Sequence, residues 1–213
     1  DDTLKILQDQ YVGIERIRIL PLQKAGVSHA RNSGLEIARG DFIAFLDTDN
    51  VWTPDYLRRM IAVCISEGAD IAYCGFSLLD SDARPKAIHG QEFDWDSYRE
   101  SNYIDLSAYL YKRTADLDCR FDIDLKKMAG WDFILRQTKG RKVVFAPFIG
   151  CHCADDLDDA SRITASQLNL YRSIVRARHH APDSTPNSHL AENVRFSIAI
   201  KTPAPMNNAK EWG

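Results

Sequence analysis

A short apolar run that ends in two closely spaced aspartates constrains the fold of this chain more than any other feature. Residues 42–46 are apolar, and Asp47 and Asp49 follow them directly in an Asp-x-Asp pattern. Thr53 and Pro54 then predict a helix start, with the threonine as N-cap and the proline at the first helical position. A buried strand that delivers carboxylates just before a helix is typical of open α/β sheets, which bind ligands at this edge.

Two carboxylates on a tight turn also predict a ligand. Hard oxygen donors suit Mg²⁺ or Mn²⁺, and such an ion commonly carries substrate phosphates. We therefore expect Asp47 and Asp49 to lie beside a metal-bridged diphosphate. The alternative for an isolated Asp-x-Asp is an ordinary turn or capping pair, and the flanking sequence has to decide between the two.

The flanking sequence resembles the core of the family 2 glycosyltransferases. Members carry a Gly-x-Ser-x-Ala-Arg-Asn-x-Gly helix, then a strand ending in Asp-Ser-Asp-Asp, then Trp-x-Pro. The matching residues are Gly26, Ser28, Ala30, Arg31, Asn32 and Gly34 in the first motif, and Asp47, Asp49, Trp52 and Pro54 in the second. Asn50 replaces the usual third aspartate, which lowers the charge of the site but keeps a carbonyl oxygen. The resemblance covers most of residues 1–165.

Composition is compatible with such an enzyme. A chain of 213 residues that is 45% apolar can bury one substantial core. A net charge of −3 gives no general attraction to nucleic acid or anionic membranes, and no apolar run approaches the length of a membrane span. Because the five cysteines form no secreted-type framework, we expect a cytoplasmic protein, at most peripheral at the inner face of the membrane.

The order of predicted elements is that of an α/β protein. We expect the end of a helix at residues 3–11, further helices over 28–39, 54–67 and 130–138, strands over 16–22, 42–46, 70–79 and 142–149, a polar excursion over 80–101, and a strand or short helix over 104–113. The helix from Pro54 has an apolar stripe of Leu57, Met60, Ile61, Cys64 and Ile65, followed by Gly68 as its end. This alternation predicts a mostly parallel sheet with helices on both faces.

The resemblance also implies a GT-A (Rossmann-like) fold and a domain organisation. Family 2 enzymes begin with a strand, a helix and a second strand that build half of the nucleotide pocket, and the start of this sequence matches only the end of that unit. We therefore expect residues 1–180 to form a GT-A domain whose first βαβ unit is missing. Residues 181–193 have linker composition, and residues 194–213 read as the start of a following domain or as a frayed tail.

Asp132 is the expected general base. Residues 130–136 resemble the family's Asp-Trp-Asp-x-x-Leu-Arg segment, whose second aspartate is the base in inverting members; Gly130 replaces the first one. A hydroxyl acceptor needs a carboxylate to remove its proton during attack. The alternative is that Asp132 is only a favourable helix N-terminal charge, worth roughly 0.3–1 kcal/mol.

His152 is flanked by two cysteines, and four aspartates follow shortly after in the chain. Cys151-His152-Cys153 could suggest zinc, but a zinc site usually needs a second ligand pair at fixed spacing. Some glycosyltransferases of this fold add a histidine metal ligand in the loop after the last core strand, and His152 is expected at that place. Otherwise it is an ordinary loop histidine.

Arg31 completes the candidate site. The resemblance places its helix beside the nucleotide, where a guanidinium suits a base edge or a phosphate; a surface salt bridge is the alternative. Asn32 and Gly34 are expected to serve packing, and Trp52 to form core or a pocket wall.

Together these residues imply an inverting, hexosyltransferase-type enzyme of polysaccharide or cell-surface glycan synthesis. Asp49 would hold Mn²⁺ or Mg²⁺ and Asp47 would contact ribose or metal-bound water. The donor would be UDP-, GDP- or dTDP-linked and the acceptor a glycan, a lipid-linked intermediate or a protein. Two alternatives stay open: a metal-dependent nucleotidyltransferase, and a non-catalytic, degenerate binding module.

Overall fold

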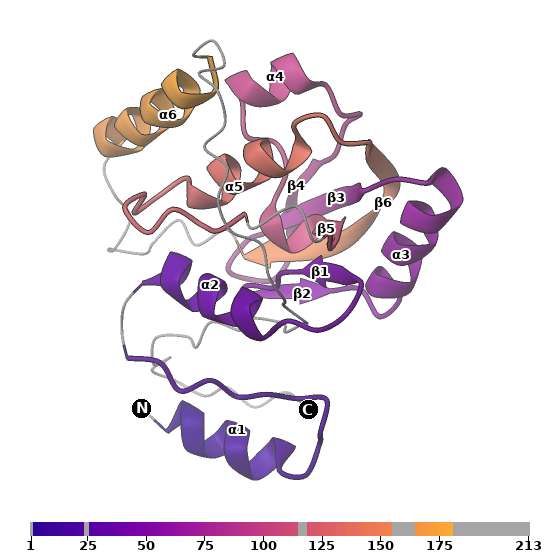
Figure 1. The fold of residues 1–213 in the computed structure, drawn as a ribbon, viewed down its shortest axis with the longest axis vertical. Helices are drawn as coiled ribbons and strands as arrows, with labels where there is room; N and C mark the ends of the chain where they lie inside the picture. The colour runs from indigo at the N-terminus through magenta and orange to yellow at the C-terminus, as the bar shows by residue number, and fades with distance from the viewer. Residues whose placement is uncertain (1, 24–25, 115–118, 155–164, 181–213) are drawn as a thin grey trace.

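A computed structural model describes residues 2–23, 26–114, 119–154 and 165–180 (Figure 1). The helices are α1 (Thr3–Tyr11), α2 (Val27–Ile37), α3 (Tyr56–Glu67), α4 (Trp95–Glu100), the 3₁₀ helix η1 (Leu106–Ala108), α5 (Ala129–Thr138) and α6 (Ala165–His180). The strands are β1 (Phe42–Ala44), β2 (Asn50–Trp52), β3 (Ile71–Leu79), β4 (Pro85–His89), β5 (Tyr109–Lys112) and β6 (Val143–Ala154). The predicted linker and tail at residues 181–213 lie outside the described residues.

The α/β class is confirmed, but the expectation of a mostly parallel sheet is wrong. The strand order is β1-β5-β3-β6-β2, with β4 also paired to β3. Within the described residues only β3 and β6 are parallel, and they are joined by a long connection containing α5, as parallel strands require. The other pairs are antiparallel. The sequence missed β4 because it lies in the polar segment 80–101, where a tight turn folds it back on β3.

Helices cover both faces of the sheet, as expected (Figure 1). Successive residues of β3 point to opposite faces, so that Ile71 and Tyr73 join the core under α2 and α5, whereas Ala72 and Cys74 join the core under α3. The apolar stripe predicted for α3 is partly wrong. Tyr56, Met60 and Cys64 are its buried face, while Leu57 and Ile65 are exposed.

Helix boundaries also differ from the prediction. α2 begins at Val27 after Gly26, so Ser28 is inside the helix and not its cap. α3 begins at Tyr56, because Thr53 is held at the sheet by a hydrogen bond from its backbone N to the Gly150 carbonyl (3.0 Å). The predicted end at Gly68 is confirmed by its left-handed conformation, φ 57°.

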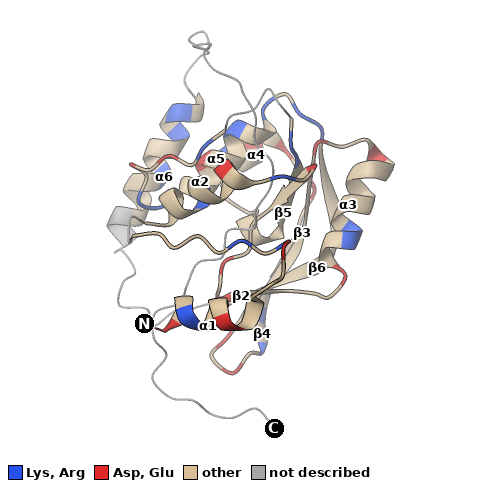
Figure 2. Cartoon of the chain, turned by 60° about the horizontal axis from the view of Figure 1, so that its bottom comes forward, with Lys and Arg blue, Asp and Glu red and all other residues tan. Residues whose placement is uncertain are grey.

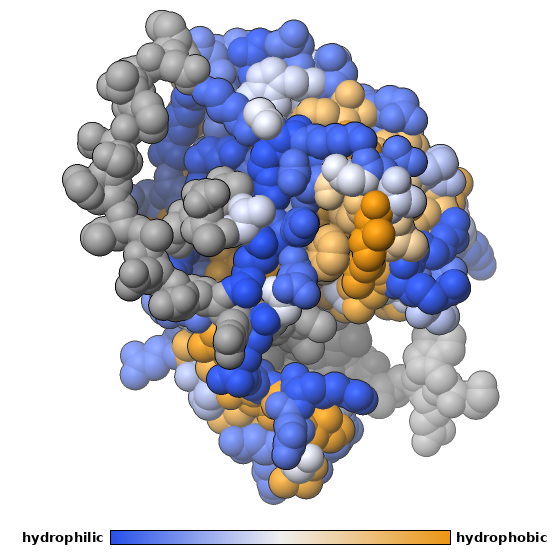
Figure 3. Space-filling view, turned by 45° about the vertical axis from the view of Figure 1, so that its right-hand side comes forward, coloured by the Kyte–Doolittle hydropathy of each residue, from blue (hydrophilic) through white to orange (hydrophobic). Residues whose placement is uncertain are grey.

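Residues 3–23 lie at one end of the molecule. Residues 3–11 form α1 as expected, but α1 buries none of its residues. The predicted strand over 16–22 is wrong: this segment is not assigned as a strand, has no strand partner among the described residues and is mostly exposed. Figure 3 shows apolar side chains on the surface of this region, at the bottom of the view. The large exposed apolar residues here are Leu4, Ile6, Tyr11, Val12, Ile14, Ile17, Leu20 and Leu22.

Among the described residues, no helix combines the length and the apolar character needed to cross a bilayer.

Candidate active site

The two aspartates of the Asp-x-Asp pattern lie on a tight turn between β1 and β2. The turn is closed by a hydrogen bond from the Asn50 N–H to the Asp47 carbonyl (3.0 Å). The predicted strand-to-turn transition is therefore present, although a short strand, β2, separates the turn from α3. The Asp49 carboxylate forms no hydrogen bond or ion pair with the described part of the chain, so its oxygens are available to a ligand.

Arg31 reaches this turn from α2. Its Nη2 lies 2.6 and 2.8 Å from the two carboxylate oxygens of Asp47, and its guanidinium lies 5.3 Å from the Phe121 ring centroid. The arginine side chain is 12% exposed and that of Asp47 31%. The structure thus brings two predicted site residues together as an ion pair, and contact of Arg31 with a nucleotide remains a prediction.

Ser107 fixes the turn from the other side. This residue of η1 is completely buried, and its Oγ accepts hydrogen bonds from Asn50 Nδ2 (2.8 Å) and the Asp47 N–H (3.3 Å). Its carbonyl accepts from Trp52 Nε1 (2.6 Å), and the Trp52 ring stacks on Tyr56. Asn50 is therefore part of the support of the turn. Ser107 could not be predicted from sequence, because its partners lie more than 50 residues away in the chain.

Asp105 is a further carboxylate near the turn that the sequence did not reveal. Its Oδ1 accepts a hydrogen bond from the Ser107 N–H (2.8 Å), which caps η1. Burial raises the pKa of Asp105, and the negative charge of Asp47 raises it further. Within the described ranges, however, no three histidine, cysteine or acidic side chains are arranged to hold a metal ion.

The expectation of a loop at His152 is wrong. β6 continues to Ala154, so His152 lies in a strand opposite Val51, and its Nδ1 lies 2.7 Å from Ser77 Oγ. The neighbouring Cys151 and Cys153 are buried in the core with their sulfur atoms 3.8 Å apart. The hydrogen bond with Cys151 and burial raise the pKa of the Cys153 thiol, which opposes the thiolate form that zinc needs. The four aspartates that follow lie outside the described residues.

Asp132 lies in the first turn of α5 and is only 1% exposed. Arg136 contacts its Oδ2 from the next turn (Nη2 at 2.8 Å), and His179 Nε2 from the end of α6 lies 3.1 Å from its Oδ1. The guanidinium of Arg178 lies slightly farther away, with Nη1 3.7 Å from Oδ1. Figure 2 shows the basic residues of α6. The sequence did not reveal that α6 contributes to this site, because His179 is 47 residues from Asp132 in the chain.

The charge state of Asp132 follows from these contacts. Burial acts to raise the pKa of Asp132, but the hydrogen bond with His179 and the charge of Arg136 outweigh it, so that the pKa is lowered overall. The carboxylate is therefore ionised at neutral pH.

Residues 119–122 connect the two halves of the site. Asn32 exchanges two hydrogen bonds with the backbone of Phe121 (2.8 and 2.9 Å), which confirms its expected packing role. The Phe121 ring stacks on Phe133 beside Asp132, with ring centroids 4.1 Å apart. Arg136 also donates to the Arg120 carbonyl (2.7 Å). A single segment thus joins the helix of Arg31 to the helix of Asp132.

Comparison with known proteins agrees with this architecture. The sequence model described as "Glycosyl transferase family 2" matches residues 1–145. The chain belongs to glycosyltransferase family 2. Similar curated proteins include the succinoglycan biosynthesis protein ExoW of Rhizobium meliloti (strain 1021), 41% identical over 204 residues, which cover 82% of this chain and 60% of ExoW. Another is ExoO of the same organism, also described as a succinoglycan biosynthesis protein, 41% identical over 70 residues, 32% of this chain and 20% of ExoO.

Solved structures show the same fold for this family 2 chain. Staphylococcus aureus TarS 1–349 in complex with UDP superposes with a TM-score of 0.61 at 14% identity, over 84% of this chain and 52% of that fragment. The complex of TarS 1–349 with UDP-GlcNAc gives a TM-score of 0.59 at 13% identity, over 82% of this chain and 53% of the fragment. The chain spans only part of these relatives, at most 60% of a curated protein named above and about half of TarS 1–349.

Proposed function

We propose that this chain is the catalytic part of an inverting, metal-dependent glycosyltransferase that transfers a sugar from a nucleotide-sugar to a hydroxyl acceptor in polysaccharide or cell-surface glycan synthesis. The observation that carries the proposal is the Asp-x-Asp turn, held between Arg31 and Ser107 in a family 2 fold. The names of ExoW and ExoO support polysaccharide synthesis, and TarS binds UDP and UDP-GlcNAc. UDP-, GDP- and dTDP-linked donors are all compatible with the turn.

Mn²⁺ or Mg²⁺ fits the residues at this turn. The Asp49 carboxylate is a hard oxygen donor without another partner in the described structure, so Asp49 would ligate the ion. When bound there, the ion would neutralise charge that develops on the departing nucleoside diphosphate. Asp47, already paired with Arg31, would contact the ribose or a metal-bound water. His152 fits less well, because it is bonded to Ser77 within the sheet.

Asp132 would act as the general base. In this proposal the acceptor hydroxyl displaces His179 from Oδ1 and transfers its proton to the carboxylate as it attacks the anomeric carbon. Arg136 would keep the carboxylate oriented through its contact with Oδ2. Attack from the face opposite the leaving diphosphate would invert the anomeric configuration.

Thermal melting with Mn²⁺ and UDP, GDP or dTDP tests the donor half of the proposal. A ligand that binds only the folded state adds about 2.7 kcal/mol at a hundredfold excess over its Kd. We expect one nucleotide to raise the melting temperature of wild type and of Asp124→Asn, an exposed acidic control, but not of Asp49→Ala. A cooperative melt without any shift would contradict the proposal and favour the degenerate binding module.

Product analysis tests the catalytic half. With the matching nucleotide-sugar and an acceptor, NMR of the product should show the opposite anomeric configuration to the donor. Asp132→Asn should lose activity while keeping the donor-induced shift in melting temperature. Retention of configuration, or full activity of Asp132→Asn, would contradict the proposed mechanism; release of diphosphate from a nucleoside triphosphate and a sugar phosphate would instead indicate a nucleotidyltransferase.

A further inference from the structure

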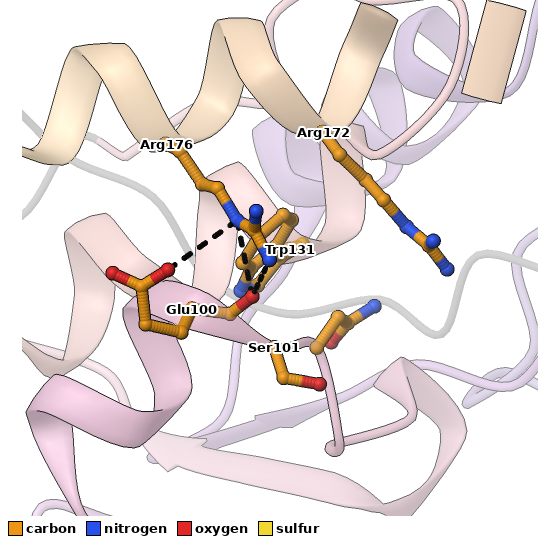
Figure 4. A pocket seen from close by; sticks show the side chains of 6 residues that line it. Glu100, Ser101, Trp131, Arg172 and Arg176 are labelled. Atoms are coloured by element: carbon orange, nitrogen blue, oxygen red, sulfur yellow. Dashed lines mark hydrogen bonds and ion pairs between the residues drawn. The ribbon is translucent and has the colours of Figure 1, made fainter. Parts of the chain in front are cut away.

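A polar cavity lies beside the proposed base, between the end of α4, the first turn of α5 and one face of α6. Its lining residues are Glu100, Ser101, Asn102, Trp131, Arg172 and Arg176 (Figure 4). Its volume of about 160 Å³ is smaller than the roughly 300–1,000 Å³ of sites that enclose a whole drug-sized ligand. The cavity can therefore hold one substituent of a larger molecule.

The charges around the cavity are unequal. The Glu100 carboxylate has a nitrogen near each oxygen, with His180 Nε2 3.0 Å from Oε1 and Arg176 Nε 3.7 Å from Oε2. Arg176 also donates from Nε to the Glu100 carbonyl (3.1 Å). Arg172 forms no ion pair or hydrogen bond with any described residue. Its guanidinium thus adds a positive charge that no carboxylate of the described residues compensates by an ion pair.

The arrangement of the side chains suits an anion. Figure 4 shows Arg172 and Arg176 on the same helix: the Arg176 side chain reaches Glu100, whereas the Arg172 side chain points away from both of them. Arg176 is held in place by Glu100, whereas the Arg172 fork remains available for a carboxylate or a phosphate. The Ser101 hydroxyl and the Asn102 amide add neutral hydrogen-bond donors.

The cavity also lies next to the reaction site. Trp131 forms part of its wall and is fixed by a hydrogen bond from Nε1 to the Tyr98 carbonyl (2.9 Å). The next residue in the same helical turn is Asp132, with its Cα about 3.8 Å away. Helix α6 supplies both Arg172 to the cavity and His179 to Asp132, and the two residues are about 10 Å apart along the helix axis. One acceptor molecule can therefore reach Asp132 with a hydroxyl and the cavity with a more distant substituent.

We propose that this cavity binds an anionic substituent of the acceptor, and that Arg172 is the residue that recognises it. The inference rests on the proposed function, because it takes the acceptor side of the enzyme to be at Asp132. A carboxylate of an acidic sugar and a phosphate on a sugar share the chemistry that Arg172 selects. The acceptor class is accordingly an anionic glycan or glycan phosphate that carries the anion and the reacting hydroxyl on the same molecule.

Ligand-observed NMR with the whole chain tests this proposal, using methyl glucuronide, glucose 6-phosphate and methyl glucoside as probes. We expect binding of at least one anionic probe, about tenfold weaker binding to Arg172→Gln, and no binding of the neutral glucoside. Arg58→Gln, which removes an exposed arginine of α3, is the matched control and should bind like wild type. Arg172→Lys keeps the positive charge but not the planar guanidinium, so its affinity for the anionic probe should lie between those of wild type and Arg172→Gln.

The two anionic probes distinguish a carboxylate from a phosphate as the natural group. The proposal is overturned if neither anionic probe binds, if the neutral glucoside binds equally well, or if Arg172→Gln binds like Arg58→Gln. Asp49→Ala should retain probe binding. If the nucleotides do not bind but the anionic probes do, the result counts against the proposed function. If the nucleotides bind but the anionic probes do not, it counts against the proposed role of this cavity alone.

Discussion

Replacing Ser107 by alanine removes one oxygen from the support of the Asp-x-Asp turn. Two donors lose their acceptor: Asn50 Nδ2, at 2.8 Å, and the Asp47 N–H, at a longer 3.3 Å. The bond from Trp52 and the backbone bond to Asp105 remain, because they are made to the Ser107 backbone, whereas the side-chain hydrogen bond of Ser107 with Asp105 is lost. An unsatisfied buried donor costs about 1–3 kcal/mol. Since the bond to Asp47 is long and Asn50 is only half-buried, we expect a loss of about 1–2 kcal/mol.

Urea unfolding and thermal melting measure this loss. For a domain of about 150–250 residues, 1 kcal/mol shifts the melting temperature by about 2–4 °C, so the expected decrease is about 2–8 °C. Ser66→Ala removes an exposed helical serine and should stay within about 0.5 kcal/mol of wild type. Ser107→Ala should also show a smaller stabilisation by Mn²⁺ and nucleotide than wild type, because the carboxylates would be less well oriented.

A double-mutant cycle with Asn50→Ala tests whether Ser107 acts through this contact. If it does, the two substitutions share one lost hydrogen bond, and the double variant should be less destabilised than the sum of the single ones. If the destabilisation of the double variant equals the sum of the two single ones within about 0.3–0.5 kcal/mol, the reasoning is refuted, because independent sites behave in that way.

Three further substitutions follow from the structure. Gly150→Ala would place a Cβ 2.6 Å from Cys74 Sγ and 2.7 Å from Tyr56 Cδ2, so overpacking should cost about 1–3 kcal/mol in urea unfolding; an unchanged midpoint would contradict this packing. Asp132→Asn should destabilise by about 1–3 kcal/mol at pH 7. Because the pKa of Asp132 is lowered on folding, the wild-type advantage should be complete above about pH 4 and disappear as the pH falls through the folded-state pKa; an equal difference at pH 7 and pH 2 would count against it. Asp105→Asn should raise stability at pH 7, because the pKa of Asp105 is raised on folding, and this gain should vanish below about pH 4; a stability loss at pH 7 would rule out the stated cause.

Local sequence predicted the features that depend on neighbouring residues. The end of the apolar run at the Asp-x-Asp turn, the left-handed Gly68 and the helix that contains Asp132 are encoded within a few positions of the chain. The resemblance to a family assigned Arg31 and Asp47 to one nucleotide site; the structure pairs the two residues, and their contact with a nucleotide stays a prediction.

Features that depend on distant partners were not predictable in the same way. Ser107 and His179 acquire their roles only when η1 and α6 pack against segments far away in sequence. His152 was interpreted as a loop residue because of the polar run after it. In the strand, the alternation of buried Cys151 and Cys153 with a less buried residue between them is a period-two pattern.

The exposed segment 3–23 has a consequence for the exchange of amide hydrogens with solvent. A helix of nine residues with no buried side chain lies below the roughly 12–15 residues at which isolated helices become even marginally stable in water. Its amides should therefore exchange through local opening of low free energy, while those in the middle of β3 should approach the exchange limit set by global unfolding. Protection of residues 3–11 would then report directly on any surface that covers their apolar side chains.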